Sequence, residues 1–320
     1  MVRWLALLGL VVAGCGTFED PNVVIDLRIL GMTATPPEQV VDISTSQNPI
    51  DLLAQIVPAK ICVLVADPNF DRRLRYRLTM CNLNSAGRCY FDAPHSVIAM
   101  GVSEDPDLTT PEPEICGTIQ PDGNLLGVVM DSLNGDALHG LGGVFYGVEL
   151  KIGGEDADES LDLYGFKELA VQPKVPDTRL ANTNPTMSGL HVTIDDVDTP
   201  VELTRCVDAV SPLVVAPKQK VRFTPEEPDG VREMYIIPTL DGQLRTFTES
   251  ITYQWIVGNG GLSSGDTGGP RDPFGNPAPL FTDFTAPNLE DVTGDIPLWL
   301  VQRDERLGES WAEACIRVQP

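Results

Sequence analysis

The stretch Ile251–Val257 reads Ile-Thr-Tyr-Gln-Trp-Ile-Val and alternates large apolar side chains with polar ones over its first five residues. Successive side chains of a strand point to opposite faces, so this alternation predicts a strand with one buried and one wet face. Leu74–Leu78 reads Leu-Arg-Tyr-Arg-Leu and repeats the pattern, again with tyrosine at the centre. Two such strands in 320 residues predict two β-domains, because a domain usually holds roughly 100–150 residues.

Other apolar runs of strand length follow along the chain, at the short spacing typical of antiparallel sandwiches. They are Val23–Leu30, Ile61–Ala66, Gly143–Ile152, Leu163–Val171, Leu190–Ile194, Leu213–Val215, Val221–Phe223, Met234–Ile237, Leu298–Val301 and Cys315–Val318. Helical spacing of apolar residues occurs over Asn124–Leu133, where Asn124 can cap the start and Gly135 can end the helix. We therefore predict an all-β protein with one short helical insertion near 124–133.

The domain boundary is predicted from composition. Pro173–Pro185 is rich in Pro, Asn and Thr and poor in apolar residues, as linkers are. Residues 23–172 would then form the first β-sandwich domain, residues 173–188 the linker and residues 189–320 the second domain.

The second half resembles a known family of surface domains. Its Tyr-x-Trp strand, Ile251–Val257, and a closing hairpin whose first strand ends in Arg303-Asp304 before a glycine turn are similar to immunoglobulin-like domains of the polycystic-kidney-disease type. Such domains are found on bacterial surface proteins. The resemblance covers roughly residues 200–320 and is fainter over 24–172. It implies two immunoglobulin-like antiparallel β-sandwiches in tandem, and it implies no activity.

The N-terminus carries an export signal. After a short basic start, the nine apolar residues Trp4–Val12 would make a helix of ~14 Å, too short to span a bilayer. The next stretch, Val12–Cys15, reads Val-Ala-Gly-Cys and resembles the lipobox of bacterial lipoproteins. That resemblance implies a signal peptide over residues 1–14, acylation of Cys15 (for example with palmitate), and a tether over 15–22. An ordinary cleaved signal peptide is the alternative.

Two further features bear on the compartment. Gly16, where lipoproteins retained at the inner membrane tend to have Asp, favours the outer membrane, facing either the periplasm or the surface. The opening Asp26–Leu30, followed by Pro36 and Pro37, is similar to uncharacterised deltaproteobacterial lipoproteins. Both observations imply a lipid-anchored protein of the cell envelope.

Cysteine usage agrees with export. Once Cys15 is set aside an even number remains, which is typical of disulfides in an oxidising compartment. The remaining cysteines are Cys62, Cys81, Cys89, Cys116, Cys206 and Cys315.

The boundary leaves two cysteines in the second domain, so Cys206 would pair with Cys315. The four cysteines of the first domain leave three pairings open. Turn-forming residues between Cys81 and Cys89 favour that pair, and Cys62 would then join Cys116. No Cys-x-x-Cys occurs, and the three histidines lie far apart in the sequence, so we expect no metal cofactor.

The charge balance limits the partners. With 46 acidic and 22 basic residues the formal net charge is −24. This balance excludes a protein that coats nucleic acid or anionic lipid through a basic surface. We expect membrane contact through the N-terminal lipid, and a partner that is another envelope protein or a surface polymer.

One motif looks catalytic. Gly265–Pro270 reads Gly-Asp-Thr-Gly-Gly-Pro, one residue from the Gly-Asp-Ser-Gly-Gly-Pro of trypsin-like proteases. Thr267 would be a hindered nucleophile, and no histidine lies in a segment like that family's base. The aspartic-protease triplet Asp-Thr-Gly occurs there only once, although such a site needs two. We therefore expect a glycine-rich surface turn inside an exposed loop, 258–279, and a second exposed loop at 103–113.

Two acidic clusters, Glu155–Asp162 and Asp195–Asp198, carry the oxygen ligands that Ca²⁺ prefers. Neither has EF-hand spacing, so we expect solvated acidic turns and keep one structural Ca²⁺ as an alternative. The sequence thus predicts a non-catalytic interaction or structural module of the envelope. A Ca²⁺-stabilised adhesion module is the first alternative and an envelope hydrolase the second.

Overall fold

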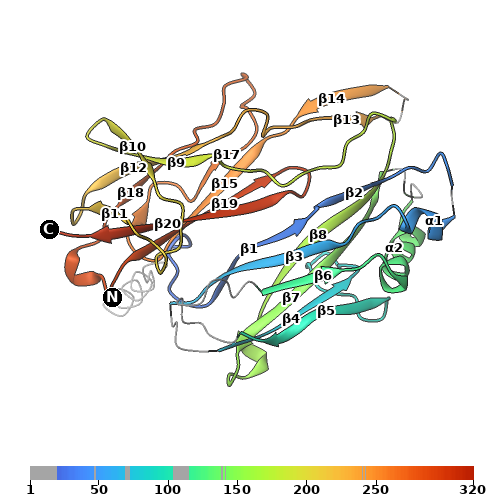
Figure 1. The fold of residues 1–320 in the computed structure, drawn as a ribbon, viewed down its shortest axis with the longest axis horizontal. Helices are drawn as coiled ribbons and strands as arrows, with labels where there is room; N and C mark the ends of the chain where they lie inside the picture. Colours follow the sequence, from blue (N-terminus) through green and yellow to red (C-terminus); the bar gives the residue numbers. More distant parts are fainter. Residues whose placement is uncertain are drawn as a thin grey trace, which may run out of the picture.

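The computed structural model describes residues 20–46, 48–68, 73–103, 115–137, 140, 142–239, 241 and 243–320. These residues form two β-sandwiches that lie side by side (Figure 1). The signal segment 1–14, Cys15, most of the tether and nearly all of the loop expected at 103–113 lie outside the described residues.

The first sandwich packs a three-stranded sheet against a five-stranded sheet. The smaller sheet has the order β1 (Arg28–Thr35), β3 (Ala59–Ala66) and β6 (Ile115–Ile119). The larger sheet has the order β2 (Glu38–Val41), β8 (Leu163–Pro173), β7 (Val144–Gly154), β4 (Leu74–Cys81) and β5 (His95–Val102). Neighbouring strands pair antiparallel, except that β2 runs parallel to β8. The expected hairpin of Gly143–Ile152 with Leu163–Val171 is therefore present as β7 and β8.

Helices are few and short. The expected helix is α2 (Gly123–Gly135), and it buries Leu125 and Val128. Its N-cap is Asp122 and not Asn124, because the helix already begins at Gly123 and the Asp122 carboxylate accepts from the first free N–H groups. The five-residue α1 (Pro49–Leu53) and two 3₁₀ turns, η1 (Glu159–Leu161) and η2 (Leu289–Asp291), were not expected. Within the described ranges, no helix has the length and apolarity needed to cross a bilayer.

The second sandwich has two five-stranded sheets. One sheet has the order β10 (Val197–Val201), β9 (Gly189–Ile194), β12 (Lys220–Glu226), β18 (Thr282–Thr285) and β16 (Gly261–Leu262). The other has the order β11 (Leu213–Val215), β20 (Glu309–Val318), β19 (Ile296–Asp304), β15 (Ile251–Val257) and β17 (Asp266–Gly268). Here β11 runs parallel to β20. A separate hairpin of β13 (Met234–Pro238) and β14 (Leu244–Thr248) is inserted between β12 and β15.

The strand orders of the two sandwiches correspond. In immunoglobulin-like folds, strands A, B and E share one sheet and strands G, F and C share the other. The first sandwich has these positions as β1-β3-β6 and β8-β7-β4, and the second has them as β9-β12-β18 and β20-β19-β15. The two sequence repeats therefore occupy the same place, strand C, as β4 and β15. The protein is all-β and consists of two immunoglobulin-like antiparallel sandwiches in tandem.

The start of the first domain differs from the prediction. Its first strand begins at Arg28, whereas Val23 forms a parallel bridge with Val257 of the second sandwich. Val24 N donates to Val257 O at 2.9 Å, and Val257 N donates to Asn22 O at 2.8 Å. The reason is an open sheet edge, because the pairing of β17 with β15 ends before Val257. Asn22–Val24 therefore fill that edge and belong with the second sandwich.

The loop expected at 258–279 is partly structured. It contains β16 and β17, which extend the two sheets at their edges. Thr267 lies on β17 opposite the buried Tyr253 and is itself buried. The centre of the glycine-rich hexapeptide, Asp266–Gly268, thus forms an edge strand and is not a free surface turn.

Candidate functional site at the domain junction

The six described cysteines form three disulfides, and their partners are those expected from the sequence. The bonds join Cys62 to Cys116, Cys81 to Cys89, and Cys206 to Cys315. Each bond lies within one sandwich. The relative position of the two sandwiches therefore depends on the connecting chain and on non-covalent contacts.

The junction has an apolar strip. Strand β19 is buried on both faces, since Leu298 and Leu300 point into the second core while Trp299 and Val301 point toward the first sandwich. Figure 1 shows β19 and β20 beside β1. The strip consists of Val24, Leu30, Leu64, Ala66, Ile256, Trp299 and Val301, with Trp311 packed against it. Burial of such a strip stabilises the junction as it would a domain core.

A buried ion pair lies beside this strip. Lys167 Nζ on β8 is 3.2 Å from Glu309 Oε2 on β20, and both side chains are less than 10% exposed. Glu309 Oε1 accepts from Met32 N at 3.0 Å and from Arg303 Nη2 at 3.1 Å. Burial lowers the pKa of Lys167, and the attraction of Glu309 opposes that change. Hydrogen bonds thus satisfy both carboxylate oxygens of Glu309.

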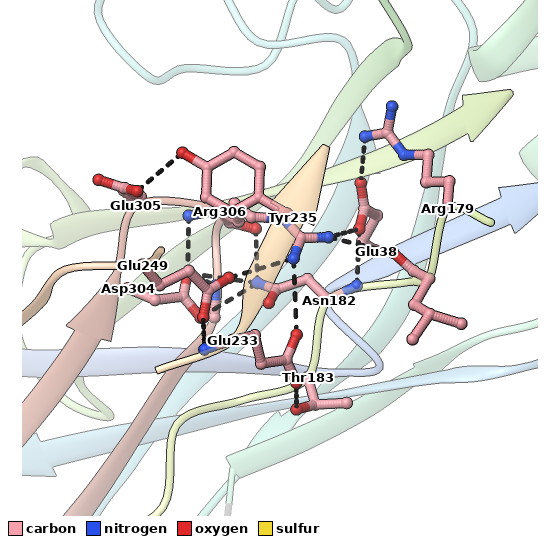
Figure 2. Close-up of polar contacts among 12 residues, drawn as sticks. Glu38, Arg179, Asn182, Thr183, Glu233, Tyr235, Glu249, Asp304, Glu305 and Arg306 are labelled. Carbon is pink, nitrogen blue, oxygen red and sulfur yellow. Dashed lines mark hydrogen bonds and ion pairs between the residues drawn. The ribbon is translucent and has the colours of Figure 1, made fainter. Parts of the chain in front are cut away.

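A second polar cluster surrounds Arg306 in the turn between β19 and β20 (Figure 2). Arg306 Nη2 donates to Glu38 Oε2 on β2 at 2.7 Å. Arg306 Nη1 lies 3.2 Å from Glu249 Oε1 and 3.5 Å from Glu233 Oε2. Arg179 Nη2 contacts the other oxygen of Glu38 at 2.9 Å. The Arg306 guanidinium therefore links Glu38 of the first sandwich to Glu233 and Glu249 of the second.

The segment expected to be a linker takes part in this cluster. Asn182 is 1% exposed, and its backbone N–H donates to Glu38 Oε2 at 2.6 Å. Its side-chain amide donates to Asp304 Oδ2 at 3.1 Å and to Arg306 O at 2.8 Å (Figure 2). The connection is therefore fastened to both sandwiches, although its composition is that of a flexible linker. Polar Asn and Thr side chains serve here as hydrogen-bonding groups of a junction.

The neighbouring carboxylates and burial change the pKa of Glu249. Its pKa is raised to about 7, first by burial and then by the negative charges of Asp304 and Glu233, while Arg306 opposes the rise. The inserted hairpin joins the same cluster, because Tyr235 OH donates to Glu305 Oε1 at 2.7 Å. Burial, with this hydrogen bond, raises the pKa of Tyr235 to about 12.

Sequence reasoning missed this junction. The only local signals are a lysine within the apolar stretch Leu163–Val171 and the charged residues around the closing turn, Arg303 to Glu309. Neither signal says which distant residue is the partner. The sandwich cores could be predicted from alternation, but the pairs across the junction could not.

The protease-like hexapeptide has a structural role. Thr267 Oγ1 accepts from Trp255 Nε1 at 2.8 Å and donates to Leu280 O at 3.1 Å. Its hydroxyl therefore satisfies the indole of the central core tryptophan. Asp266 is exposed on the same short strand.

Carboxylates of both acidic clusters contact basic side chains of the protein. Asp162 accepts from Arg75 and lies 3.3 Å from Lys151 Nζ. Asp198 Oδ2 lies 2.7 Å from His191 Nδ1 at the β9–β10 hairpin. Over the described residues, no group of three or more His, Cys, Asp or Glu side chains is arranged to hold a metal ion.

Comparisons with known proteins give distant likenesses. No protein-family model matches the chain, and no curated protein matches it. Red sea bream transglutaminase is similar over 93% of this chain and 32% of its own, with 9% identity and a TM-score of 0.25, so this chain spans about a third of it.

Two other solved structures are similar over most of both chains. The two tandem V-type regions of VCBP3, a v-region-containing chitin binding protein, share 8% identity over 92% of this chain and 100% of theirs, with a TM-score of 0.24. A partial N-terminal region of an enterococcal surface protein shares 9% identity over 95% and 98%, with a TM-score of 0.24. The fold class follows from the strand order itself.

Proposed function

We propose that this chain is a lipid-anchored, non-catalytic interaction module of the bacterial cell envelope, built as one rigid body. The observation that supports this proposal is the junction, where an apolar strip, a buried ion pair and the Arg306 cluster join the two sandwiches. Tandem domains move relative to each other unless their interface is large and apolar. A fixed junction holds the loops of both sandwiches in one geometry, which suits presentation of a binding surface.

The N-terminal segment supports a defined position relative to the membrane. Asn22–Val24 are paired with Val257 of the second sandwich. Asn22 lies seven positions after Cys15, and a chain of seven extended residues reaches at most about 25 Å. An acylated Cys15 would therefore hold that end of the second sandwich close to the bilayer. The three disulfides agree with export, because such bonds persist in oxidising compartments.

The anchor is tested by metabolic labelling with palmitate. Cys15→Ala should abolish labelling and release the protein from the membrane fraction, whereas Thr17→Ala, two residues further on, should leave both unchanged. A Cys15→Ala protein that still labels would contradict the lipobox interpretation.

The non-catalytic role is tested with a panel of peptide and ester substrates. The full chain should show no turnover above that of a Thr267→Ala variant, which lacks the hydroxyl. Turnover in the parent that needs Asp266 or Thr267 would instead favour the envelope hydrolase.

A further inference from the structure

The inserted hairpin of β13 and β14 has an open strand edge. Strand β14 pairs with β13 on one side and, among the described residues, with no strand on the other. All five residues of β14 are exposed, and Figure 1 shows it above β13 at the upper rim of the molecule. A hairpin of two strands is only marginally stable by itself, so a further strand at this edge would stabilise it.

The hydrogen bonds at the two ends of the hairpin show which backbone groups of β14 point outward. Thr239 N donates to Gln243 O at 2.8 Å, and Glu249 N donates to Glu233 O at 2.9 Å. Backbone groups of successive residues in a strand point to opposite sides. The odd-numbered residues of β14 therefore bond to β13, and the even-numbered residues direct their N–H and C=O groups away from it. The outward residues are Leu244, Thr246 and Thr248.

This edge lacks the features that usually prevent pairing with another chain. Over the described residues, the two sheets of the second sandwich have β10, β16, β11 and β17 as their edge strands. Strands β11, β16 and β17 are two or three residues long, and β10 contains Asp198 and Pro200. Short length, charge and proline each protect an edge. Strand β14 has five residues with no proline and no acidic side chain.

The charge of the hairpin favours a second copy of the chain as the partner. The formal net charge of the chain is −24, so two copies repel each other over most of their surface. Residues 234–248 contain one acidic and one basic residue, Asp241 and Arg245, and are neutral in sum. Two copies that meet at this hairpin therefore meet where the local charge opposes them least.

We propose that β14 pairs antiparallel with β14 of a second copy about a two-fold axis at Thr246, so that the two hairpins form one four-stranded sheet. In this register Thr246 pairs with itself, and Leu244 pairs with Thr248 of the second copy, so the outward donors and acceptors satisfy each other. Arg245 then lies opposite Phe247 of the second copy, where a guanidinium can contact the aromatic ring. Both side chains are exposed in the single copy, so the body of the protein does not cover them.

The symmetry of this contact limits the assembly to a dimer. An isologous contact uses the same edge of both copies and leaves no edge of β14 for a third. The hairpin precedes β15 at Ile251, whereas Asn22–Val24 contact β15 at its other end, at Val257. The pairing needs no lipid anchor, so its failure would leave the proposed function as it stands.

The test is sedimentation equilibrium of the full chain over a range of concentrations, where we expect a reversible monomer–dimer equilibrium. Thr246→Lys should raise the dissociation constant of the dimer about tenfold, because two like charges then meet at the axis. The control Thr199→Lys makes the same change on the exposed edge strand β10 and should leave the dimer unchanged. Both variants lower the net negative charge equally, so a difference between them locates the contact. Thermal unfolding of each variant checks that the fold is retained.

Cross-linking tests the register. In a Cys15→Ala background, Thr246→Cys should form a disulfide-linked dimer under mild oxidation. The Cα atoms of a hydrogen-bonded antiparallel pair are about 5.5 Å apart, which a disulfide can span. Thr199→Cys in the same background should stay monomeric under the same conditions.

The unaltered protein gives an independent readout through salt. The dimer should become tighter as the ionic strength rises from about 0.01 M to about 0.15 M, because salt screens the repulsion between two acidic bodies. A chain that is monomeric at every concentration would overturn the proposal, even if its β14 edge bound an added extended peptide. So would a Thr246→Lys variant that dimerises as the parent does, or a Thr246→Cys variant that cross-links no better than Thr199→Cys.

Discussion

Lys167 of the first sandwich and Glu309 of the second form an ion pair across the junction, with 3.2 Å between Nζ and Oε2 and both side chains buried. The two residues are 142 positions apart in the chain. A buried pair of this kind adds little net stability over apolar residues of the same shape, but removal of one partner leaves an uncompensated charge. The pair therefore makes the relative position of the sandwiches specific.

Replacement of the lysine alone should be destabilising. Lys167→Met leaves Glu309 with Arg303 and Met32 N as its remaining donors, and we expect a loss of roughly 2–4 kcal/mol in the free energy of unfolding. The double variant Lys167→Met with Glu309→Gln should recover part of the loss, because no buried charge remains. Urea unfolding measures both, and Lys174→Met, at an exposed lysine, is the control. A single variant as stable as the control would contradict this account of the junction.

The hydroxyl of Thr267 should contribute to the stability of the second sandwich. Thr267→Val keeps the shape but leaves the buried Trp255 N–H without its acceptor, so the free energy of unfolding should fall by about 1–3 kcal/mol. Thr267→Ser retains the hydroxyl and should lose much less. Denaturant unfolding followed by tryptophan fluorescence compares the two. Equal stability of the Val and Ser variants would show that this hydrogen bond contributes nothing.

Stability should depend on pH through Glu249. Its pKa is raised to about 7 in the folded protein, above the ordinary glutamate value of 4.5, so the folded state binds more protons between these two pH values. The free energy of unfolding should therefore fall as pH rises from about 4.5 to about 7, by roughly 2 kcal/mol, and then level off. Glu249→Gln should remove this slope and be the more stable protein at pH 8. The control Glu290→Gln should keep the slope, and a parent whose stability rises over this range would refute the prediction.

The disulfide of Cys206 with Cys315 should be the strongest single constraint on the unfolded second domain. The two cysteines are 109 residues apart, and in the chain-entropy model a loop of this length is worth ~4–5 kcal/mol, an upper figure because strain is ignored. The double variant Cys206→Ala with Cys315→Ala should lower the melting temperature more than the pair Cys81→Ala with Cys89→Ala, whose separation is 8. Peptide mapping without reduction checks the pairing itself. Recovery of Cys206 linked to a cysteine of the first domain would contradict it.

The amino-acid sequence by itself determined the fold class and many of the strands, but it did not predict others such as β5, β6 and β14. Alternation in Leu74–Leu78 and Ile251–Val257 is a local property, because neighbouring residues of a strand face opposite sides, and it placed both segments correctly as strands. Their common position as strand C came from the sheet topology. Helical spacing placed α2 within two residues at each end, although it missed Asp122 as the cap. Turn residues between Cys81 and Cys89 likewise act locally, and that disulfide is present.

Only the tertiary structure decided how the two sandwiches meet. Arg306 and Glu38 are 268 positions apart, and nothing near either residue indicates the other. Asn182 sits in a segment whose composition is that of a linker, yet its environment buries it, since two domains supply the groups that it bonds. Asn22–Val24 joined the second sandwich because β17 leaves the edge of β15 open at Val257. Such contacts depend on which surfaces face each other after folding. A pattern of neighbouring residues cannot predict which distant surfaces will meet.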